Sequence, residues 1–136
     1  MSTKEEQAKQ KYMELQLLMQ HVQELNQQIE RAQEQFAQTT ALKTYIEDFA
    51  NAKKGDRVYA GVGPGMFVEA SLEETGKVLV NIGANVAVYK SLSDTKNLVE
   101  KQTKDLQEVM EKMAVEMQKL TQRSESLQEE LKTLVQ

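Results

Sequence analysis

The sequence of 136 residues contains no cysteine and no tryptophan, a single histidine, His21, and a single proline, Pro64. Without cysteine the chain can form neither a disulfide framework nor a cysteine-ligated metal site. Aromatic residues make up only 5% of the chain, so the large side chains that fill a globular core are scarce. The composition therefore does not indicate a compact domain, and its Gln, Glu, Lys, Leu and Met favour long helices.

The sequence also lacks long apolar runs and an excess of positive charge. No stretch approaches the roughly 20 apolar residues that span a bilayer, and the first residues, MSTKEEQAKQKYM, lack the apolar segment of a signal peptide. The net charge of −4 argues against nucleic acid as the main partner, because phosphate binding depends on clustered Lys and Arg. We expect a soluble cytoplasmic protein that binds neither membrane nor nucleic acid.

The first third of the chain has the heptad pattern of a coiled coil. Apolar residues between Leu15 and Thr39 recur at alternating steps of three and four, as in an a/d seam. This seam consists of Leu15, Leu18, Val22, Leu25, Ile29, Ala32, Phe36 and Thr39. The pattern then loosens through Leu42, Ile46 and Phe49. It predicts a helix over about residues 3–53, roughly 70 Å long.

The last third of the chain repeats this pattern. Its seam consists of Leu92, Val99, Thr103, Leu106, Met110, Met113, Met117, Leu120, Ser124, Leu127, Leu131 and Leu134, with the charged Lys96 between the first two. Ser91 or Ser93 can cap the helix start, where Asp94 suits the positive end of the helix dipole. Because the two helices match in length, we predict an antiparallel two-helix coiled coil with both chain ends at one tip.

The middle of the chain is organised differently, because residues 55–90 hold all six glycines and the proline. Alternating apolar residues predict strands near Arg57–Val62, Met66–Ser71, Lys77–Ile82 and Val86–Lys90. The sequences Gly63-Pro64-Gly65 and Gly83-Ala84-Asn85 are typical of hairpin turns. In the third strand Leu79 lies opposite the other apolar residues, so both faces of this strand are expected to be covered.

Two isolated hairpins are marginal in water, and their edges invite pairing with other chains. We therefore expect the hairpins of several chains to pair and close together. The contact residues are expected to be Val62, Met66, Phe67, Val68, Val78, Leu79, Val80, Ile82, Val86 and Val88. The predicted fold class is α+β but mostly helical, with one coiled-coil helix in residues 1–54, an oligomerisation module in 55–90 and a second helix in 91–136, all within one structural domain.

The order helix, two hairpins, helix resembles the alpha-class subunits of prefoldin. The resemblance is specific between about Tyr59 and Thr95, where GVGPGMFVEASLEETGKVLVNIGANVAVYKSLSDT is similar to the hairpin region of that class. Beta-class subunits carry a single hairpin, so the second hairpin indicates the alpha class, of archaeal type. One departure is Gly61, where members of the family commonly have a proline; the only proline here stands in the turn, as Pro64.

The resemblance implies both an architecture and an activity. Prefoldins are hexamers of two alpha and four beta subunits, whose hairpins form intersubunit β-barrels and whose coiled coils project from that platform. The tips of the coiled coils hold unfolded polypeptides and pass them to a group II chaperonin without ATP. The resemblance therefore implies a chaperone subunit whose partners are beta-class subunits, unfolded clients and a chaperonin.

The residues themselves supply a candidate binding surface. A two-helix coiled coil needs apolar residues only at its a and d positions. In YMELQLLMQHV, residues 12–22, four apolar side chains lie off the seam, namely Tyr12, Met13, Leu17 and Met19. Such a cluster needs a reason, and flexible Met side chains suit contact with many sequences. We interpret these four residues, together with Leu131 and Leu134, as a client-binding surface.

Alternatives remain open at two levels. The apolar cluster can instead pack against the helix of a neighbouring subunit or a third strand of coiled coil, or be exposed incidentally. The whole chain can instead be a structural coiled-coil protein that forms rods or filaments through its hairpins without binding clients.

The other motifs indicate structure rather than chemistry. Met110, Met113 and Met117 all lie on the seam and are expected to fill it. His21 flanks the seam and is the only histidine of a chain without cysteine, so a typical metal site is not expected. The segment GVGPG lacks the following helix and the Lys-Ser/Thr pair of a phosphate-binding loop. We find no nucleophile–base pair, and we predict a protein that is not an enzyme and needs no cofactor.

Overall fold

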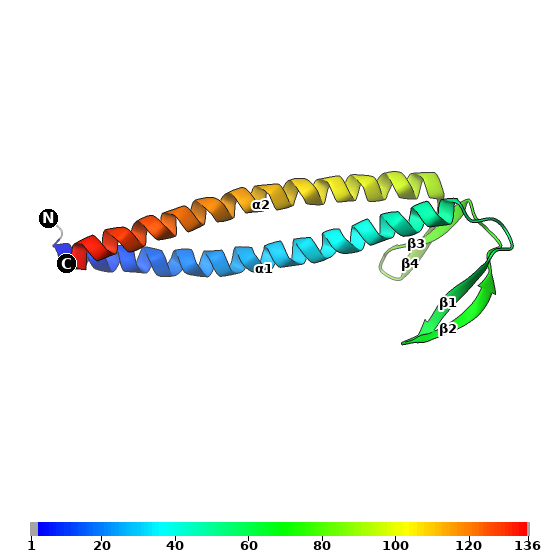
Figure 1. The fold of residues 1–136 in the computed structure, drawn as a ribbon, viewed down its shortest axis with the longest axis horizontal. Helices are drawn as coiled ribbons and strands as arrows, with labels where there is room; N and C mark the ends of the chain where they lie inside the picture. Colours follow the sequence, from blue (N-terminus) through cyan, green and yellow to red (C-terminus); the bar gives the residue numbers. More distant parts are fainter. Residues whose placement is uncertain (1–2, 136) are drawn as a thin grey trace. The chain divides into compact units, whose positions relative to one another are not determined.

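A computed structural model describes residues 3–135 of the chain. Two long helices, α1 (Lys4–Ala50) and α2 (Leu92–Val135), enclose four strands in the sequence (Figure 1). The strands are β1 (Arg57–Gly63), β2 (Met66–Ser71), β3 (Lys77–Gly83) and β4 (Val86–Ser91). The predicted helices and all four predicted strands are confirmed, with strand ends within one residue of expectation. The chain divides into two units, residues 1–36 with 105–136 and residues 37–104, which are described separately below.

In the first unit, α1 and α2 pack side by side and antiparallel along a narrow apolar seam. Leu15, Leu25, Ala32 and Leu127 are buried, and the other predicted seam residues of this unit are half-buried. Two contacts between the helices show the register, because Lys11 lies 2.7 Å from Glu130 near one end of the pairing while His21 lies 3.6 Å from Glu116 further along. The first described turn of α1 therefore lies beside the last described turn of α2 (Figure 1).

Both helices begin with side-chain caps. At the start of α1 the Glu6 amide donates to Thr3 Oγ1 and the Thr3 amide donates to Glu6 Oε2, each at 3.3 Å, which is a capping box. At the start of α2 the Asp94 amide donates to Ser91 Oγ at 3.1 Å. The structure thus confirms Ser91 as the predicted cap, with Asp94 in the first turn of the helix.

In the second unit the seam departs from the prediction at two positions. Thr95, not Lys96, fills the gap between the first two seam residues of α2; Thr95 is 7% exposed and Lys96 is exposed. Its methyl group can enter the seam because its hydroxyl donates to the carbonyl of Ser91 at 2.8 Å. On α1, Leu42 is 44% exposed, because steps of four and three from Thr39 lead to Lys43 and the buried Ile46 instead.

The four strands form two separate two-stranded sheets, β1 with β2 and β3 with β4, both antiparallel. The predicted turns are confirmed, but their geometries differ. Gly65 has a positive φ of 68° after Pro64, as in a type II turn, whereas Ala84 and Asn85 both have positive φ, 52° and 61°, as in type I′. Gly61, the departure from the family pattern, pairs with Phe67 on β2, and the first hairpin keeps its register around it up to a bulge.

The two hairpins follow one plan. Arg57 pairs with Ser71 and Lys77 with Ser91, so the registers coincide when the numbering is shifted by 20. The bulge repeats as well, between Gly61 and Gly63 in the first hairpin and at the corresponding place in the second. After each hairpin a leucine amide donates back to the residue before the first strand, at 2.9 Å in one case and 3.0 Å in the other. The chain therefore presents two similar sheets.

The thin seam makes a sharp prediction about stability. Leu127 is fully buried at 0% exposure, so we expect Leu127→Ala to lower the free energy of unfolding by about 2–4 kcal/mol. Leu17→Ala, the matched control at 67% exposure, should change it by less than about 0.5 kcal/mol. Urea unfolding followed by circular dichroism measures both, and an equal loss for the two variants would show that Leu127 is not part of the core.

Candidate functional site

Exposed apolar side chains gather on α1 in the first unit. Tyr12, Met13, Leu17 and Met19 are 54–67% exposed, so all four predicted off-seam residues lie at the surface. Met13, Leu17 and Met19 line a shallow hollow of about 590 Å³. Its remaining lining consists of Gln16, Gln20 and Gln23. Since the seam does not use these side chains, this face of α1 is the first candidate binding surface, which we call the α1 face (Tyr12–Gln23).

The two candidates from the second helix lie differently. Leu131 and Leu134 are half-buried, as seam positions require, so they are less exposed than the four residues on α1. Leu131 nevertheless borders a second hollow together with Val135, which is 78% exposed. The sequence reasoning missed Val135, although as an apolar residue one step past the last seam position it could have been noticed.

Gln128 links these surfaces. It borders the hollow with Leu131 and Val135, and it also borders a hollow of about 290 Å³ between the helices that includes Met19. The structure therefore brings the end of α2 close to the α1 face on one side of the pair. The predicted client-binding residues likewise came from both helices.

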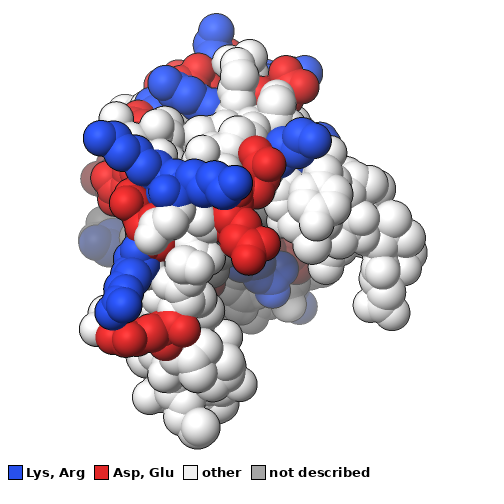
Figure 2. Space-filling model, turned by 90° about the vertical axis from the view of Figure 1, so that its right-hand side faces the viewer, with Lys and Arg blue, Asp and Glu red and all other residues white. Residues whose placement is uncertain are grey.

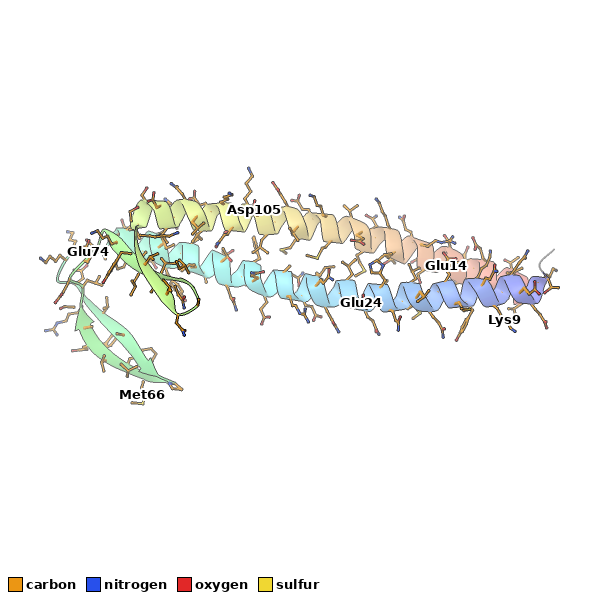
Figure 3. All side chains as sticks on the ribbon, turned by 180° about the vertical axis from the view of Figure 1, so that it is seen from behind. Lys9, Glu14, Glu24, Met66, Glu74 and Asp105 are labelled. Atoms are coloured by element: carbon orange, nitrogen blue, oxygen red, sulfur yellow. The ribbon has the colours of Figure 1, made fainter. Side chains whose placement is uncertain are left out.

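The charged groups of the same region lie on another side of α1. Lys11 Nζ donates to Glu130 Oε2 at 2.7 Å, and Arg123 Nη2 donates to Glu14 Oε1 at 3.0 Å. Arg123 also lies 3.9 Å from Glu130, so the four side chains form one network, and Figure 3 shows Glu14 on the side of α1 toward α2. The hydrogen bond from Lys11 and the nearby positive charges hold the pKa of Glu130 below its ordinary value, although partial desolvation opposes this.

The hairpins of the second unit present the other candidate surface. Of the ten predicted contact residues, Val62, Met66, Phe67, Val68, Leu79, Ile82 and Val86 are 47–66% exposed, and Val78, Val80 and Val88 are half-buried. Figure 3 shows Met66 at the end of the first hairpin, and in Figure 2 the far ends of the two projecting parts are white, without charged side chains. Large apolar side chains on two-stranded sheets are unusual in water and indicate a surface that partners cover.

Two exposed tyrosines on the hairpins were missed by the sequence reasoning. Tyr59 is 74% exposed and, with Phe67, lines a hollow on the first sheet; Tyr89 is 73% exposed and pairs directly with Leu79 across the second. Strand alternation could have found both, because it places Tyr59 and Leu79 at equivalent positions of the two hairpins.

Within residues 3–135 the polar side chains do not gather into a candidate metal centre. Among them no group of three His, Asp or Glu side chains is placed to hold a metal ion. Every buried side-chain nitrogen or oxygen in this part of the chain has a hydrogen-bond partner. No helix within the described range has a segment apolar and long enough to cross a membrane.

These features define a two-helix coiled-coil protein with two open hairpins and apolar side chains exposed in both of its units. Comparison with known proteins identifies the family. The model of the prefoldin subunit family matches residues 18–136, and the chain belongs to this family. Membership supports a chaperone-type subunit that works in an assembly with other prefoldin subunits.

Individual relatives agree with this assignment. The chain is 31% identical to prefoldin subunit alpha of Methanobrevibacter smithii over 71% of its own length and 66% of that subunit. It is 25% identical to prefoldin subunit alpha of Thermofilum pendens over 88% of its own length and 92% of that subunit. Among solved structures, a filamentous prefoldin from Methanocaldococcus jannaschii has the same fold, with a TM-score of 0.71 at 20% identity, covering 85% of this chain and 95% of that one.

The ion-pair network predicts a pH dependence. Because folding lowers the pKa of Glu130, its contribution to stability is present above the pKa of an unfolded glutamate, about 4.3, and is lost as the pH falls through the lowered value. Glu130→Gln should therefore lower the melting temperature at pH 7 by about one to three degrees, since the pair is partly exposed, and the difference should shrink as the pH falls and Glu130 becomes protonated. Glu129→Gln, at an exposed position without such a contact, is the control. A difference that persists unchanged at pH 3 would contradict the assignment.

Proposed function

We propose that this chain is an ATP-independent holdase subunit of the alpha class, which captures unfolded polypeptides on the α1 face (Tyr12–Gln23). The observation that carries the proposal is the exposure of Tyr12, Met13, Leu17 and Met19 beside a seam that does not need them. Leu131 and Val135 extend the same surface from α2, and the half-buried Leu134 is included with them in this proposal. Family membership supports the same activity.

The size of this surface explains why the capture is reversible. Full burial of one such side chain contributes roughly 1.5–3 kcal/mol, and ordering an unfolded client opposes this gain. A single chain therefore binds weakly. Several chains on one platform would raise the effective affinity through avidity without any new contact, and release would need no nucleotide.

The hairpins supply that platform in this proposal. Partner chains of the beta class cover the exposed sheet faces and edges, two alpha with four beta subunits, and close them into β-barrels. The repeated plan of the two hairpins supports this, because it offers two similar docking sites in each chain. The assembled particle acts in the cytoplasm and delivers its clients to a group II chaperonin.

The client surface can be tested by removing its apolar side chains. We expect Met13→Ser combined with Leu17→Ser and Met19→Ser to abolish most of the suppression of light scattering by a denatured model protein, with the oligomer intact. The matched control is Val109→Ser with Val115→Ser, which removes apolar side chains that are 46% and 53% exposed on α2. Undiminished suppression by the first variant would show that clients bind elsewhere.

The assembly role can be tested by deletion. Joining the two helices directly after removal of residues 57–90 should leave a monomeric helical hairpin, because the sheets that bind partners are gone. Mass photometry in the presence of beta subunits measures the outcome. A hexamer that survives the deletion would assign assembly to the helices instead.

A second candidate function is a structural protein that forms filaments through its hairpins without binding clients. It is supported by the shared fold with a prefoldin that is filamentous, and by the apolar residues on both hairpins. Electron microscopy of the purified chain combined with the scattering assay separates the two functions. Filaments that leave aggregation of a denatured protein unchanged would favour the structural role.

A further inference from the structure

The α1 face (Tyr12–Gln23) contains a regular arrangement of glutamines that binding of apolar side chains alone does not require. At 3.6 residues per turn, Gln16, Gln20 and Gln23 fall within about 60° of one another on the helix. Tyr12 and Met19 lie along one side of these amides, and Met13 and Leu17 lie along the other. The hollow on this face is lined by the three amides together with Met13, Leu17 and Met19. The face is therefore a row of amides between two apolar margins.

The amides in this row are available for binding. All three glutamines are exposed, and no hydrogen bond joins their side chains to any other residue within 3–135. Two polar groups near the face have partners elsewhere, since Glu14 bonds Arg123 and His21 lies 3.6 Å from Glu116 on the other flank of α1. The hollow itself has no charged residue in its lining. The lining therefore offers amide and apolar groups to a ligand, and no charge.

The chemistry of glutamine points to one kind of ligand. A glutamine amide carries both donors and an acceptor, as does the peptide group. Along the helix Gln16 and Gln20 are about 6 Å apart and Gln20 and Gln23 about 4.5 Å. An extended chain repeats its same-side peptide groups at about 6.6 Å, a spacing that long, flexible amide side chains can follow.

The same residues disfavour a third helix on this face. The steps from Met13 to Gln16, Gln20 and Gln23 are three, four and three, which is the spacing of a second seam. A helix packed there would bury amides against side chains, while its own backbone groups are already paired. Polar groups buried without partners are costly, so the row suits a ligand with free backbone groups.

We propose that Gln16, Gln20 and Gln23 hydrogen-bond the backbone of an extended client segment while the apolar margins contact its side chains. This inference rests on the proposed function and deepens it. Backbone groups are paired in folded proteins and free in unfolded ones, so the row selects for the unfolded state independently of sequence. The glutamines are specificity-determining residues, and the apolar side chains supply most of the affinity.

The test compares two probes on the full-length chain in its assembled form. One probe is a short fluorescent, uncharged, unstructured peptide, and the other is the same peptide with alternate backbone nitrogens methylated, which removes hydrogen-bond donors. Fluorescence anisotropy should show the wild type binding the first probe about tenfold more tightly, from a few hydrogen bonds. In Gln16→Ala with Gln20→Ala and Gln23→Ala this preference should fall to nearly one.

Three further variants show whether the preference depends on the amide groups, on side-chain size, on glutamines elsewhere or on the apolar side chains. Replacing the same three glutamines with Met keeps the side-chain size, and the preference should again be lost. Gln107→Ala with Gln118→Ala and Gln122→Ala removes three exposed amides from α2 and should keep the wild-type preference. The triple serine variant of Met13, Leu17 and Met19 should weaken both probes and leave their ratio unchanged.

The outcomes distinguish this inference from the proposed function. If the wild type binds both probes equally, or if the Ala and Met variants keep the preference, the amide row plays no part in recognition although client capture stands. If the wild type binds neither probe and does not suppress aggregation, the proposed function fails and the inference fails with it.

Discussion

A pair of helices can bury only one stripe of each partner, and the rest of the structure depends on this constraint. In the first unit that stripe is thin, with Leu127 as a fully buried side chain and many seam residues only half-buried. Every apolar side chain off the stripe remains in water unless another chain covers it. An exposed Met or Leu on α1 is therefore available for contact with a partner, because the fold has no second layer that could bury it.

The hairpins, like the helix pair, have surfaces that the chain itself does not cover. A two-stranded sheet has two faces and two edges, and β1–β2 and β3–β4 do not pair with each other to reduce these. Because the second hairpin repeats the register and bulge of the first, a partner element that fits one is close to fitting the other. The two hairpins differ in their side chains, for example Tyr59 in the first and Leu79 at the equivalent position of the second. A partner can distinguish the hairpins by these side chains.

The sequence predicted the elements because each depends on local periodicity or turn chemistry. Heptad steps defined both helices, and glycine-rich turns bounded the four strands. The prediction was wrong where a polar residue lies in the seam or an apolar residue lies outside it. Thr95 entered the seam because its hydroxyl bonds its own helix, and Leu42 was displaced from it because the heptad continued through Lys43. Tyr59 and Tyr89 were missed although strand alternation places them on the face opposite the half-buried Val58 and Val88.

The candidate site could be predicted in its apolar part alone, for a physical reason. An apolar residue off a seam is anomalous and draws notice, whereas a glutamine on a helix surface is ordinary, so only the hollow and the charges paired on the other flank single out Gln16 and Gln20. The amides also interrupt the apolar surface of α1. Two apolar margins fused into one stripe would form a second seam and recruit another helix, closing the surface permanently. Amides between the margins keep that surface open in water and still offer bonds to an unfolded backbone, so the same side chains oppose self-association and favour capture.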